Sequence, residues 1–278
     1  MFLSGKTFPR KRMSQPAVMP NLKTTARMTF GQREVMEPMS DTEKRIALLI
    51  DADNAPASKI DVVLAEVARH GSANVRRAYG NWKSPHLAQW EAKLHAYAIR
   101  PMQQFAYSSG KNASDMAMVV DAMDLLYARS TDAFAIVSSD ADFTPLVMRI
   151  LTDGIKVYGF GQQKTPQPFV DACSQFTYVE ALVQQSPQSD EPIVEISDKN
   201  KLRSDTRLVL MLRNAVDAAS TDDGWAHLGH VGSQIGNQAS FDPRNYGYRN
   251  LSALIEATEL FEVRRNDLTV LVRDKRRT

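Results

Sequence analysis

The sequence predicts an α/β fold, in which a parallel sheet is flanked by helices, followed by a smaller helical unit with a C-terminal hairpin. Three observations lead to this prediction. Short apolar strand patterns alternate with helical patterns from Lys44 to about Leu182, which is typical of parallel strands with right-handed crossovers. Two of the strands end in Asp-Ala-Asp, and a polar stretch with two prolines follows at 183–201. We interpret that stretch as a linker.

The strand predictions rest on short apolar runs, and the helix predictions rest on apolar residues spaced three and four apart. The predicted strands are Arg45 to Ile50, Val75 to Tyr79, Ile99 to Tyr107, Phe134 to Val137, Ile155 to Phe160 and Tyr178 to Val179. The predicted helices cover about 57–69, 85–97, 114–129, 143–153 and 168–175. Together they define a first domain at 43–182.

The second unit is predicted at 202–275. Helical patterns cover Ser204 to Ala218, His227 to Gln238 and Tyr248 to Ala257, and two alternating strands surround Asn266-Asp267. Three helices and a terminal hairpin describe a winged helix. At the other end, residues 1–42 contain four prolines and the basic run Arg10-Lys11-Arg12, without sustained periodicity. We predict that this segment is a disordered, solvated basic tail.

Composition restricts the compartment and the class of protein. The chain has 278 residues, of which 43% are hydrophobic and 24% charged, so one sizeable domain and one small domain fit. No apolar run approaches the ~20 residues of a membrane span, and the N-terminus lacks a signal-peptide core. The single Cys173 cannot form an internal disulfide. We therefore expect a cytoplasmic protein without membrane contact.

Carboxylates follow two of the predicted strands. The strand that ends at Ile50 runs into Asp51 and Asp53, and the strand that ends at Val137 runs through Ser138 and Ser139 into Asp140 and Asp142. Ligands of open α/β sheets bind outside the carboxyl ends of the strands. Four carboxylates placed together repel one another unless a cation lies between them. The sequence therefore predicts a site for a divalent cation.

A third acid, Asp115, opens the helix at 114–129, where Ser114 or Asn112 can act as the N-cap. A favourable interaction with the helix dipole explains Asp115 without any function. A role for Asp115 in the site becomes more plausible beside Asp51 and Asp140, because this helix can begin at the same sheet edge. Asp124 is predicted to be solvated, and Asp121 is either a surface residue or a support for the metal site.

Other chemistries lack their motifs. Gly110-Lys111 has neither the earlier glycine nor the following Ser or Thr of a nucleotide-binding loop, and the serines lack a nucleophile elbow. The five histidines have no zinc-ligand spacing. An all-oxygen site remains, in which carboxylates and the Asn54 amide favour Mg²⁺ or Mn²⁺. Such ions orient hydroxide and stabilise the leaving oxygen in phosphodiester hydrolysis.

The acidic motifs resemble the NYN domain, a PIN-like and Rossmann-like nuclease family, in its bacterial LabA-like branch. The resemblance rests on Ile50-Asp51-Ala52-Asp53-Asn54, on Gly110-Lys111 with Asp115, and on Ser138-Ser139-Asp140-Ala141-Asp142-Phe143. It implies a metal-dependent ribonuclease. The implied catalytic and metal-binding residues are Asp51, Asp115, Asp140 and Asp142. The implied supporting residues are Asp53, Asn54, Lys111, as a phosphate contact, and Ser139.

The C-terminal unit resembles the LOTUS domain, also called OST-HTH. The resemblance rests on the run from Phe241 to Ile255, on Leu260 to Val263 and on Gly224-Trp225 with Leu228. It implies RNA binding, single-stranded or structured, with phosphate contacts and stacking by Arg244, Tyr246, Tyr248 and Arg249. The two tyrosines can equally be interpreted as core or turn residues. Some domains of this family bind proteins instead, so protein partners and assembly into homo-oligomers stay open.

The sequence thus favours a metal-dependent endoribonuclease whose C-terminal domain presents RNA to the acidic site. A catalytically inactive regulator that binds RNA or protein through the same two domains is the alternative. A phosphatase with an aspartyl nucleophile is a third hypothesis, because Asp51 and Asp53 form its Asp-x-Asp pattern. The expected downstream lysine and paired acids are not arranged for that chemistry.

Overall fold

The computed structural model describes residues 43–105, 112–183, 197–266 and 269–277. The predicted tail at 1–42 and most of the predicted linker lie outside these ranges. The described residues from 43 onward cluster as one unit by their contacts. Within the described ranges, no helix has both the length and the apolar character needed to cross a membrane.

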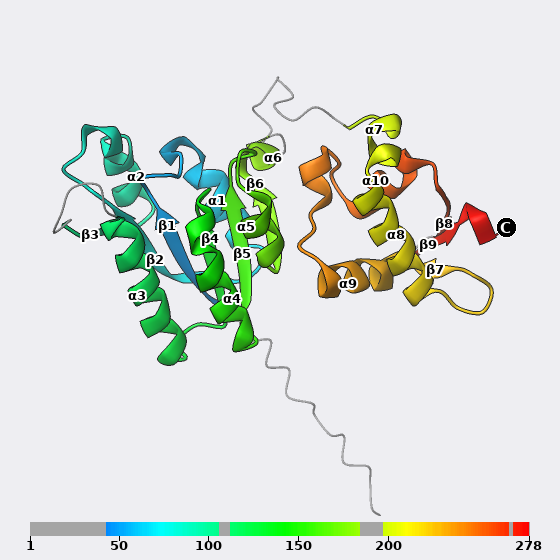
Figure 1. Cartoon of the computed structure of the whole chain (residues 1–278), viewed down its shortest axis with the longest axis horizontal. Coiled ribbons are helices and arrows are strands. Elements are labelled where there is room, and N and C mark those ends of the chain that lie inside the picture. Colours follow the sequence, from blue (N-terminus) through cyan, green and yellow to red (C-terminus); the bar gives the residue numbers. More distant parts are fainter. Residues whose placement is uncertain (1–42, 106–111, 184–196, 267–268, 278) are drawn as a thin grey trace, which may run out of the picture. The chain divides into compact units, whose positions relative to one another are not determined.

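Six strands of the described residues form one parallel sheet in the order β3-β2-β1-β4-β5-β6 (Figure 1). The strands are β1 (Arg45–Asp51), β2 (Ser72–Gly80), β3 (Arg100–Gln103), β4 (Ala133–Val137), β5 (Lys156–Gly161) and β6 (Gln175–Tyr178). The predicted α/β class with a parallel sheet is therefore confirmed. Strands β1 and β4, which carry the acidic motifs, are neighbours at the centre of the sheet.

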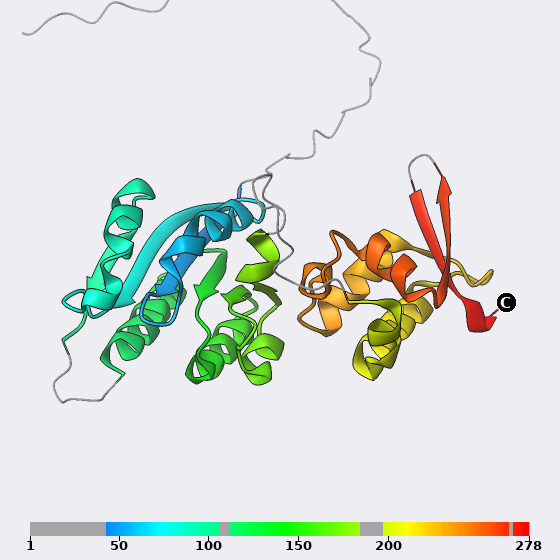
Figure 2. The same cartoon turned by 90° about the horizontal axis from the view of Figure 1, so that it is seen from above.

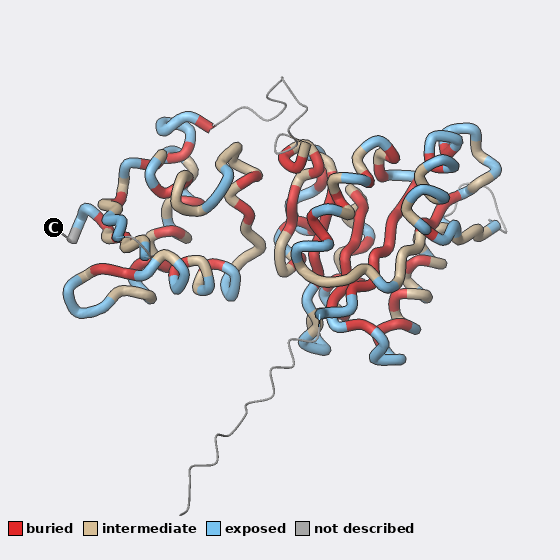
Figure 3. The backbone as a smooth tube through the Cα atoms, turned by 180° about the vertical axis from the view of Figure 1, so that it is seen from behind, coloured by how far each residue is buried: buried red, intermediate tan, exposed pale blue. Residues whose placement is uncertain are grey.

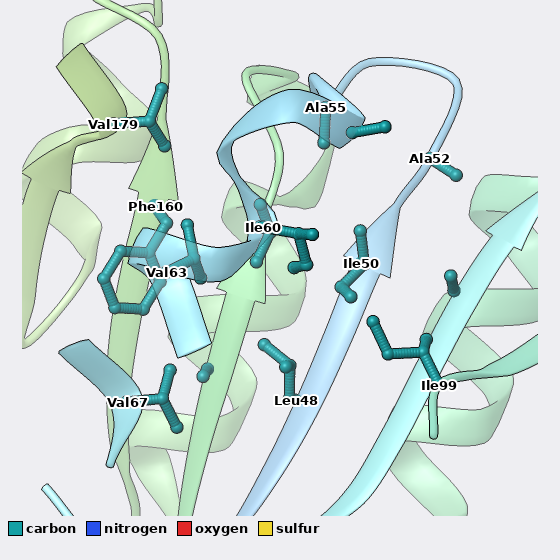
Figure 4. Close-up of a cluster of buried hydrophobic side chains, with 14 of the residues drawn as sticks. Leu48, Ile50, Ala52, Ala55, Ile60, Val63, Val67, Ile99, Phe160 and Val179 are labelled. Carbon is teal, nitrogen blue, oxygen red and sulfur yellow. The ribbon is translucent and has the colours of Figure 1, made fainter. Parts of the chain in front are cut away.

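Helices cover both faces of this sheet. They are η1 (Ala57–Lys59), α1 (Ile60–Val67), η2 (Pro85–Leu87), α2 (Trp90–Ala96), α3 (Ala113–Tyr127), η3 (Ala141–Phe143), α4 (Thr144–Thr152), α5 (Gln167–Ala172) and α6 (Val179–Val183), where η marks a 3-10 helix. Side chains of α1 and α6 (Figure 4), together with Trp90 of α2, bury one face, and those of α3, α4 and α5 bury the other. Because both faces are covered, β1 is apolar at every position from Ile46 to Ile50, and the central strands are buried (Figure 3).

Some predicted elements differ from the structure. The strand predicted at Tyr178 to Val179 is wrong, because β6 ends at Tyr178 and Val179 begins α6. The predicted helix at 168–175 ends earlier, at Ala172, and Gln175 already belongs to β6. Short apolar runs such as these carry no period that separates a strand from a helix.

The second unit packs helices on a small antiparallel sheet of order β7-β9-β8. Its elements are α7 (Lys199–Ser204), α8 (Thr206–Ala219), β7 (Ala226–His227), α9 (Leu228–Gln238), η4 (Pro243–Tyr246), α10 (Leu251–Thr258), β8 (Phe261–Asn266), β9 (Thr269–Asp274) and η5 (Lys275–Arg277). Strands β8 and β9 form the predicted hairpin (Figure 2). The sequence did not indicate α7 or β7. The core of this unit includes Leu208, Leu212, Ile235 and Leu254.

Candidate active site

Asp51 ends β1 and is the most enclosed of the predicted site acids, with 1% of its surface exposed. Two side chains hold its carboxylate. Ser138, directly after β4, donates a hydrogen bond of 2.6 Å, and Asn54 donates one of 3.0 Å through its amide. Because β1 and β4 are neighbouring parallel strands, the sheet itself brings Ser138 to Asp51. The supporting role of Asn54 in the site stays a prediction.

Asp140 and Asp142 follow Ser138 in a tight turn. The backbone N–H of Asp140 donates to the Ser138 hydroxyl at 3.0 Å, and the Asp140 carboxylate accepts from the backbone N–H of Asp142 at 2.9 Å. Asp140 is thereby the N-cap of η3. Ser139 accepts a hydrogen bond from the backbone N–H of Gln162, just after β5, at 2.9 Å. Ser138 joins the two acidic motifs, and its place after a buried strand was the available signal for this role.

Asp115 and Asp53 are brought together at the start of α3. Ser114 donates a hydrogen bond of 2.9 Å to the Asp53 carboxylate. Asn112, one of the two predicted candidates, is the N-cap of α3, although its side chain makes no capping hydrogen bond. The Ser114 hydroxyl instead ties the helix to the loop after β1. Asp53 is exposed and Asp115 is half-buried.

The acids perturb one another electrostatically. Burial, and then the charges of Asp51, Asp140, Asp53 and Asp142 in that order of effect, together raise the pKa of Asp115 to about 6. Burial also raises the pKa of Asp51, against the hydrogen bonds from Ser138 and Asn54, which lower it. The charges of these five carboxylates therefore act on one another within one region of the site.

This donor set fits a hard divalent cation in its chemistry, because every group is a carboxylate or an amide oxygen. Five mutually repelling acids are the environment that a cation would relieve. Throughout the described part of the chain, however, no three Asp, Glu, His or Cys side chains stand close enough together to hold a metal ion as they are.

Two further aspartates of α3, Asp121 and Asp124, lie outside the acidic cluster. Asp121 accepts hydrogen bonds from Arg77 and Tyr79, both on β2, so its carboxylate supports the packing of α3 on the sheet. Asp124 is exposed, as predicted. Lys111 lies outside the described residues.

Arg244, predicted to contact RNA, is buried with 8% of its surface exposed. Its guanidinium makes a bidentate ion pair with Glu66 of α1, with both distances 2.7 Å, and a second ion pair with Asp242 at 2.6 Å. Asp242 in turn accepts a hydrogen bond of 2.7 Å from Thr177 of β6. Bidentate pairing uses the fork geometry of arginine fully. The structure therefore removes Arg244 from the predicted RNA surface.

The neighbouring Asn245 covers the open edge of the sheet. Its side-chain oxygen accepts from the backbone N–H of Tyr178 at 3.0 Å, and its amide donates to the carbonyl of Phe176 at 2.9 Å. Strand β6 is an edge strand, so these bonds replace those of a further strand. The run from Phe241 to Tyr246 is thus a clasp on the first domain, which the sequence did not reveal.

The other three residues predicted to contact RNA differ in exposure. Tyr246 packs against the core of the second unit, and burial raises its pKa to about 12. Tyr248 is half-buried and donates a hydrogen bond of 2.6 Å to the carbonyl of Ser197. Arg249 is exposed. The interpretation of the tyrosines as core or turn residues agrees with these contacts.

Positive charge gathers on the β8-β9 hairpin. The guanidiniums of Arg264 and Arg273 lie 4.4 and 4.7 Å from the centre of the Trp225 ring. Such contacts are cation–π interactions. Arg273 is also paired with Glu262. Sequence reasoning treated Trp225 only as part of a motif, and its stacking partners come from strands about 40 to 50 residues later in the chain.

Comparison with known proteins matches residues 45–180 to the NYN domain and residues 202–272 to the OST-HTH/LOTUS domain. Two solved structures are similar. One is a crystal structure of a protein of unknown function from Vibrio parahaemolyticus, with 22% identity, a TM-score of 0.43, and coverage of 50% of this chain and 94% of that chain. The other is a solution NMR structure of an uncharacterized protein from Nitrosomonas europaea, with 29% identity, a TM-score of 0.24, and coverage of 33% and 88%. No curated protein matches the chain.

Proposed function

We propose that this chain, which carries an NYN domain followed by an OST-HTH/LOTUS domain, is a metal-dependent endoribonuclease that hydrolyses RNA phosphodiester bonds. The observation that carries the proposal is Asp115, whose pKa rises to about 6 through burial and the charges of four other acids at the carboxyl ends of β1 and β4. Clusters of perturbed acids at such edges are typical of functional sites. Structural packing offers no reason to gather so many like charges.

Four aspartates supply the carboxylate oxygens of the proposed site. Asp51, fixed by Ser138 and Asn54, offers a carboxylate oxygen at a set position. Asp140 and Asp142 offer two more from one turn, and Asp115 offers a fourth from α3. A bound Mg²⁺ or Mn²⁺ would supply Lewis acidity toward the phosphodiester and a hydroxide nucleophile. With its raised pKa, the Asp115 carboxylate holds a proton more readily than an ordinary aspartate does.

The second domain supplies affinity for RNA in this proposal. Arg249 and Arg264 are exposed and offer positive charge to phosphates, whereas the exposed Arg265 is paired with Glu256 at 2.6 Å. Arg264 also stacks on Trp225, which presents its guanidinium in a fixed orientation. Backbone phosphates dominate the affinity of nucleic-acid binding, so these residues replace Arg244 in the role assigned from the sequence.

The proposal is tested by incubating the full-length protein with single-stranded RNA and Mn²⁺ or Mg²⁺. We expect cleavage that stops with chelator and is lost in Asp51→Asn and Asp140→Asn, because each replacement removes a charge from the acidic cluster while keeping the shape of the side chain. Asp124→Asn is the matched control, since Asp124 is an exposed acid on α3. Undiminished cleavage by both Asp51→Asn and Asp140→Asn would end the assignment.

The second candidate function is an RNA-binding regulator without cleavage. It is favoured by the side chains themselves, because no three potential ligands of the described ranges are close enough to hold an ion. In this case the wild-type protein binds RNA, and neither metal produces cleavage at any concentration. Asp140→Asn would then bind RNA at least as tightly as the wild type, since a negative charge has been removed.

A further inference from the structure

Phe105 is an exposed aromatic side chain near the acidic edge of the sheet. It follows β3 by two residues, and 57% of its surface is open to solvent. A single exposed apolar side chain is ordinary by itself, so the case for a binding role depends on what lies beside the ring. Strand β3 lies two strands from β1, which corresponds to about 10 Å at ordinary strand spacing. A short stretch of single-stranded RNA can span that separation.

A cation accompanies this ring. The Lys83 ammonium lies 4.9 Å from the centre of the Phe105 ring. Lys83 is exposed, and across the residues that the structure describes no carboxylate pairs with it. An unpaired ammonium over an exposed aromatic ring offers both contacts that a nucleotide needs, since a base can stack on the ring and the ammonium can neutralise a phosphate.

Hydrogen bonds fix the loop that carries Lys83. The backbone N–H of Trp82 donates to the Gln103 side chain at 2.8 Å, and the Trp82 indole N–H donates to the carbonyl of Met102 at 3.0 Å. Both partners belong to β3, so the chain after β2 is tied to the strand that leads to Phe105. The backbone segments that carry the aromatic ring and the ammonium are thus tied to each other before any ligand arrives, which lowers the entropy cost of binding.

The same edge continues to the acids. Parallel pairing places Gly80 beside Gln103, and an added Cβ on Gly80 would stand 3.5 Å from an oxygen of Asp53. Asp53 in turn accepts from Ser114, next to Asp115. Phe105 and the acidic cluster therefore lie along one rim formed by the ends of β3, β2 and β1.

From this arrangement we propose that Phe105 and Lys83 form a nucleotide subsite, where Phe105 stacks on one base of a single-stranded RNA and Lys83 contacts an adjoining phosphate. This inference rests on the proposed function, because it names where the substrate of that site is held. Stacking on an aromatic ring tolerates every base, so the subsite positions RNA without reading its sequence.

Tyr127 provides a matched control. It is also an exposed aromatic residue, with 69% of its surface open, and the Arg149 guanidinium lies 5.7 Å from its ring centre. Tyr127 ends α3, whereas Asp115 lies in the first turn. At 1.5 Å per residue, the two are about 18 Å apart along the helix. Arg149 is moreover paired with Asp153.

The experiment measures binding of labelled oligouridine and oligoadenosine to the full-length protein by fluorescence anisotropy in chelator, where no cleavage occurs. We expect Phe105→Ala and Phe105→Leu to weaken binding by about 5- to 100-fold, because stacking is lost in both, and Phe105→Trp to keep it. Lys83→Ala lowers the salt slope by about 0.7, the value for one phosphate on a single strand. Tyr127→Ala binds as the wild type does.

Wild-type affinity in Phe105→Ala would overturn the subsite, and so would an equal loss in Tyr127→Ala. Wild-type affinity in Phe105→Leu would also overturn stacking, since an apolar contact would then suffice. These outcomes are separate from the test of cleavage. If binding depends on Phe105 but no metal produces cleavage, the nuclease proposal fails and the subsite stands. If the wild type cleaves and Phe105→Ala binds normally, the reverse holds.

Discussion

Asp51 illustrates how single residues prepare the site. A carboxylate with 1% exposure loses most of its hydration, which burial alone would make costly. The hydroxyl of Ser138 and the amide of Asn54 replace part of that hydration and fix the orientation of the carboxylate. At Asp115, burial and the neighbouring charges act in the same direction, and they raise its pKa to about 6.

The raised pKa of Asp115 predicts how Asp115→Asn changes the stability of the protein with pH in metal-free buffer. Burial and neighbouring acids raise the folded-state pKa from 3.8 to about 6, so ionisation destabilises the folded state as the pH rises through that window. The variant should melt at a higher temperature than the wild type at about pH 8. At about pH 4 the two should differ little, because Asp115 is then largely protonated in the folded wild type.

Thermal unfolding at the two pH values measures this effect, and Asp124→Asn, on the exposed side of the same helix, should leave the melting temperature unchanged at both. An Asp115→Asn variant that melts at or below the wild-type temperature at about pH 8 would contradict mutual repulsion of the acids.

At the same scale, the sequence predicted which acids follow β1 and β4 because strand ends are visible as the end of an apolar run. It did not predict the partners of Ser114 and Arg244. The Ser114 hydroxyl can either cap α3 or donate a hydrogen bond to Asp53, which lies 61 residues away, and it does the latter. The partner of Arg244, Glu66, is 178 residues away. Such choices are made by tertiary neighbours and leave no local pattern.

Helices were predicted well where they were long, and strands where they formed an unbroken apolar run. Helix α3, with 15 residues, and the five apolar residues of β4 were found within two residues of their observed bounds. The six residues of α5, the four of β6 and the five of α6 were confused, because none is long enough to display its period. Strand β6 is also an edge strand of only four residues, so its pairing is settled by what covers it.

Asn245 supplies that cover, which leads to a prediction for Asn245→Ala. The replacement removes hydrogen bonds to the backbone of Tyr178 and Phe176 and leaves both groups without these partners. We expect the free energy of unfolding to fall by about 1 to 3 kcal/mol, as for other buried groups that lose a partner. Hydrogen exchange of the Tyr178 amide should also accelerate.

Chemical denaturation and amide exchange test this expectation. Asn237→Ala is the matched control, since Asn237 is an exposed asparagine near the end of α9 and should cost little. Unchanged exchange at Tyr178 in Asn245→Ala would show that the clasp does not protect the edge of the sheet.

For the whole molecule, the clasp changes how the basic residues of the second domain are interpreted. The sequence grouped Arg244 with Arg249 as phosphate contacts because both lie in one motif. Their exposure separates them: Arg244 is buried between Glu66 and Asp242, whereas Arg249 is exposed. One arginine therefore stabilises the association of the two domains, and the other is available to a ligand.

Two full-length variants separate these roles. Arg244→Ala removes the closest ion-pair partner of both Glu66 and Asp242, so we expect a loss of unfolding free energy on the order of 3 kcal/mol, as for other broken buried ion pairs. It should leave the salt dependence of RNA binding unchanged. The double variant Arg249→Ala with Arg264→Ala should do the opposite, keeping the melting temperature while lowering the salt slope by about 0.7 for each single-strand phosphate that is no longer neutralised.

Denaturation curves and salt titrations of RNA binding, carried out on the same preparations, distinguish the two variants. Glu66→Gln is the matched control for Arg244→Ala, because it removes the bidentate ion pair from the other side and should also reduce stability without a change in slope. If Arg244→Ala lowers the slope and keeps the melting temperature, the guanidinium contacts phosphates, and the buried ion pair with Glu66 is not maintained in solution. Burial of this arginine in the clasp would then have to be abandoned, and with it the assignment of RNA contacts to Arg249 and Arg264 in its place.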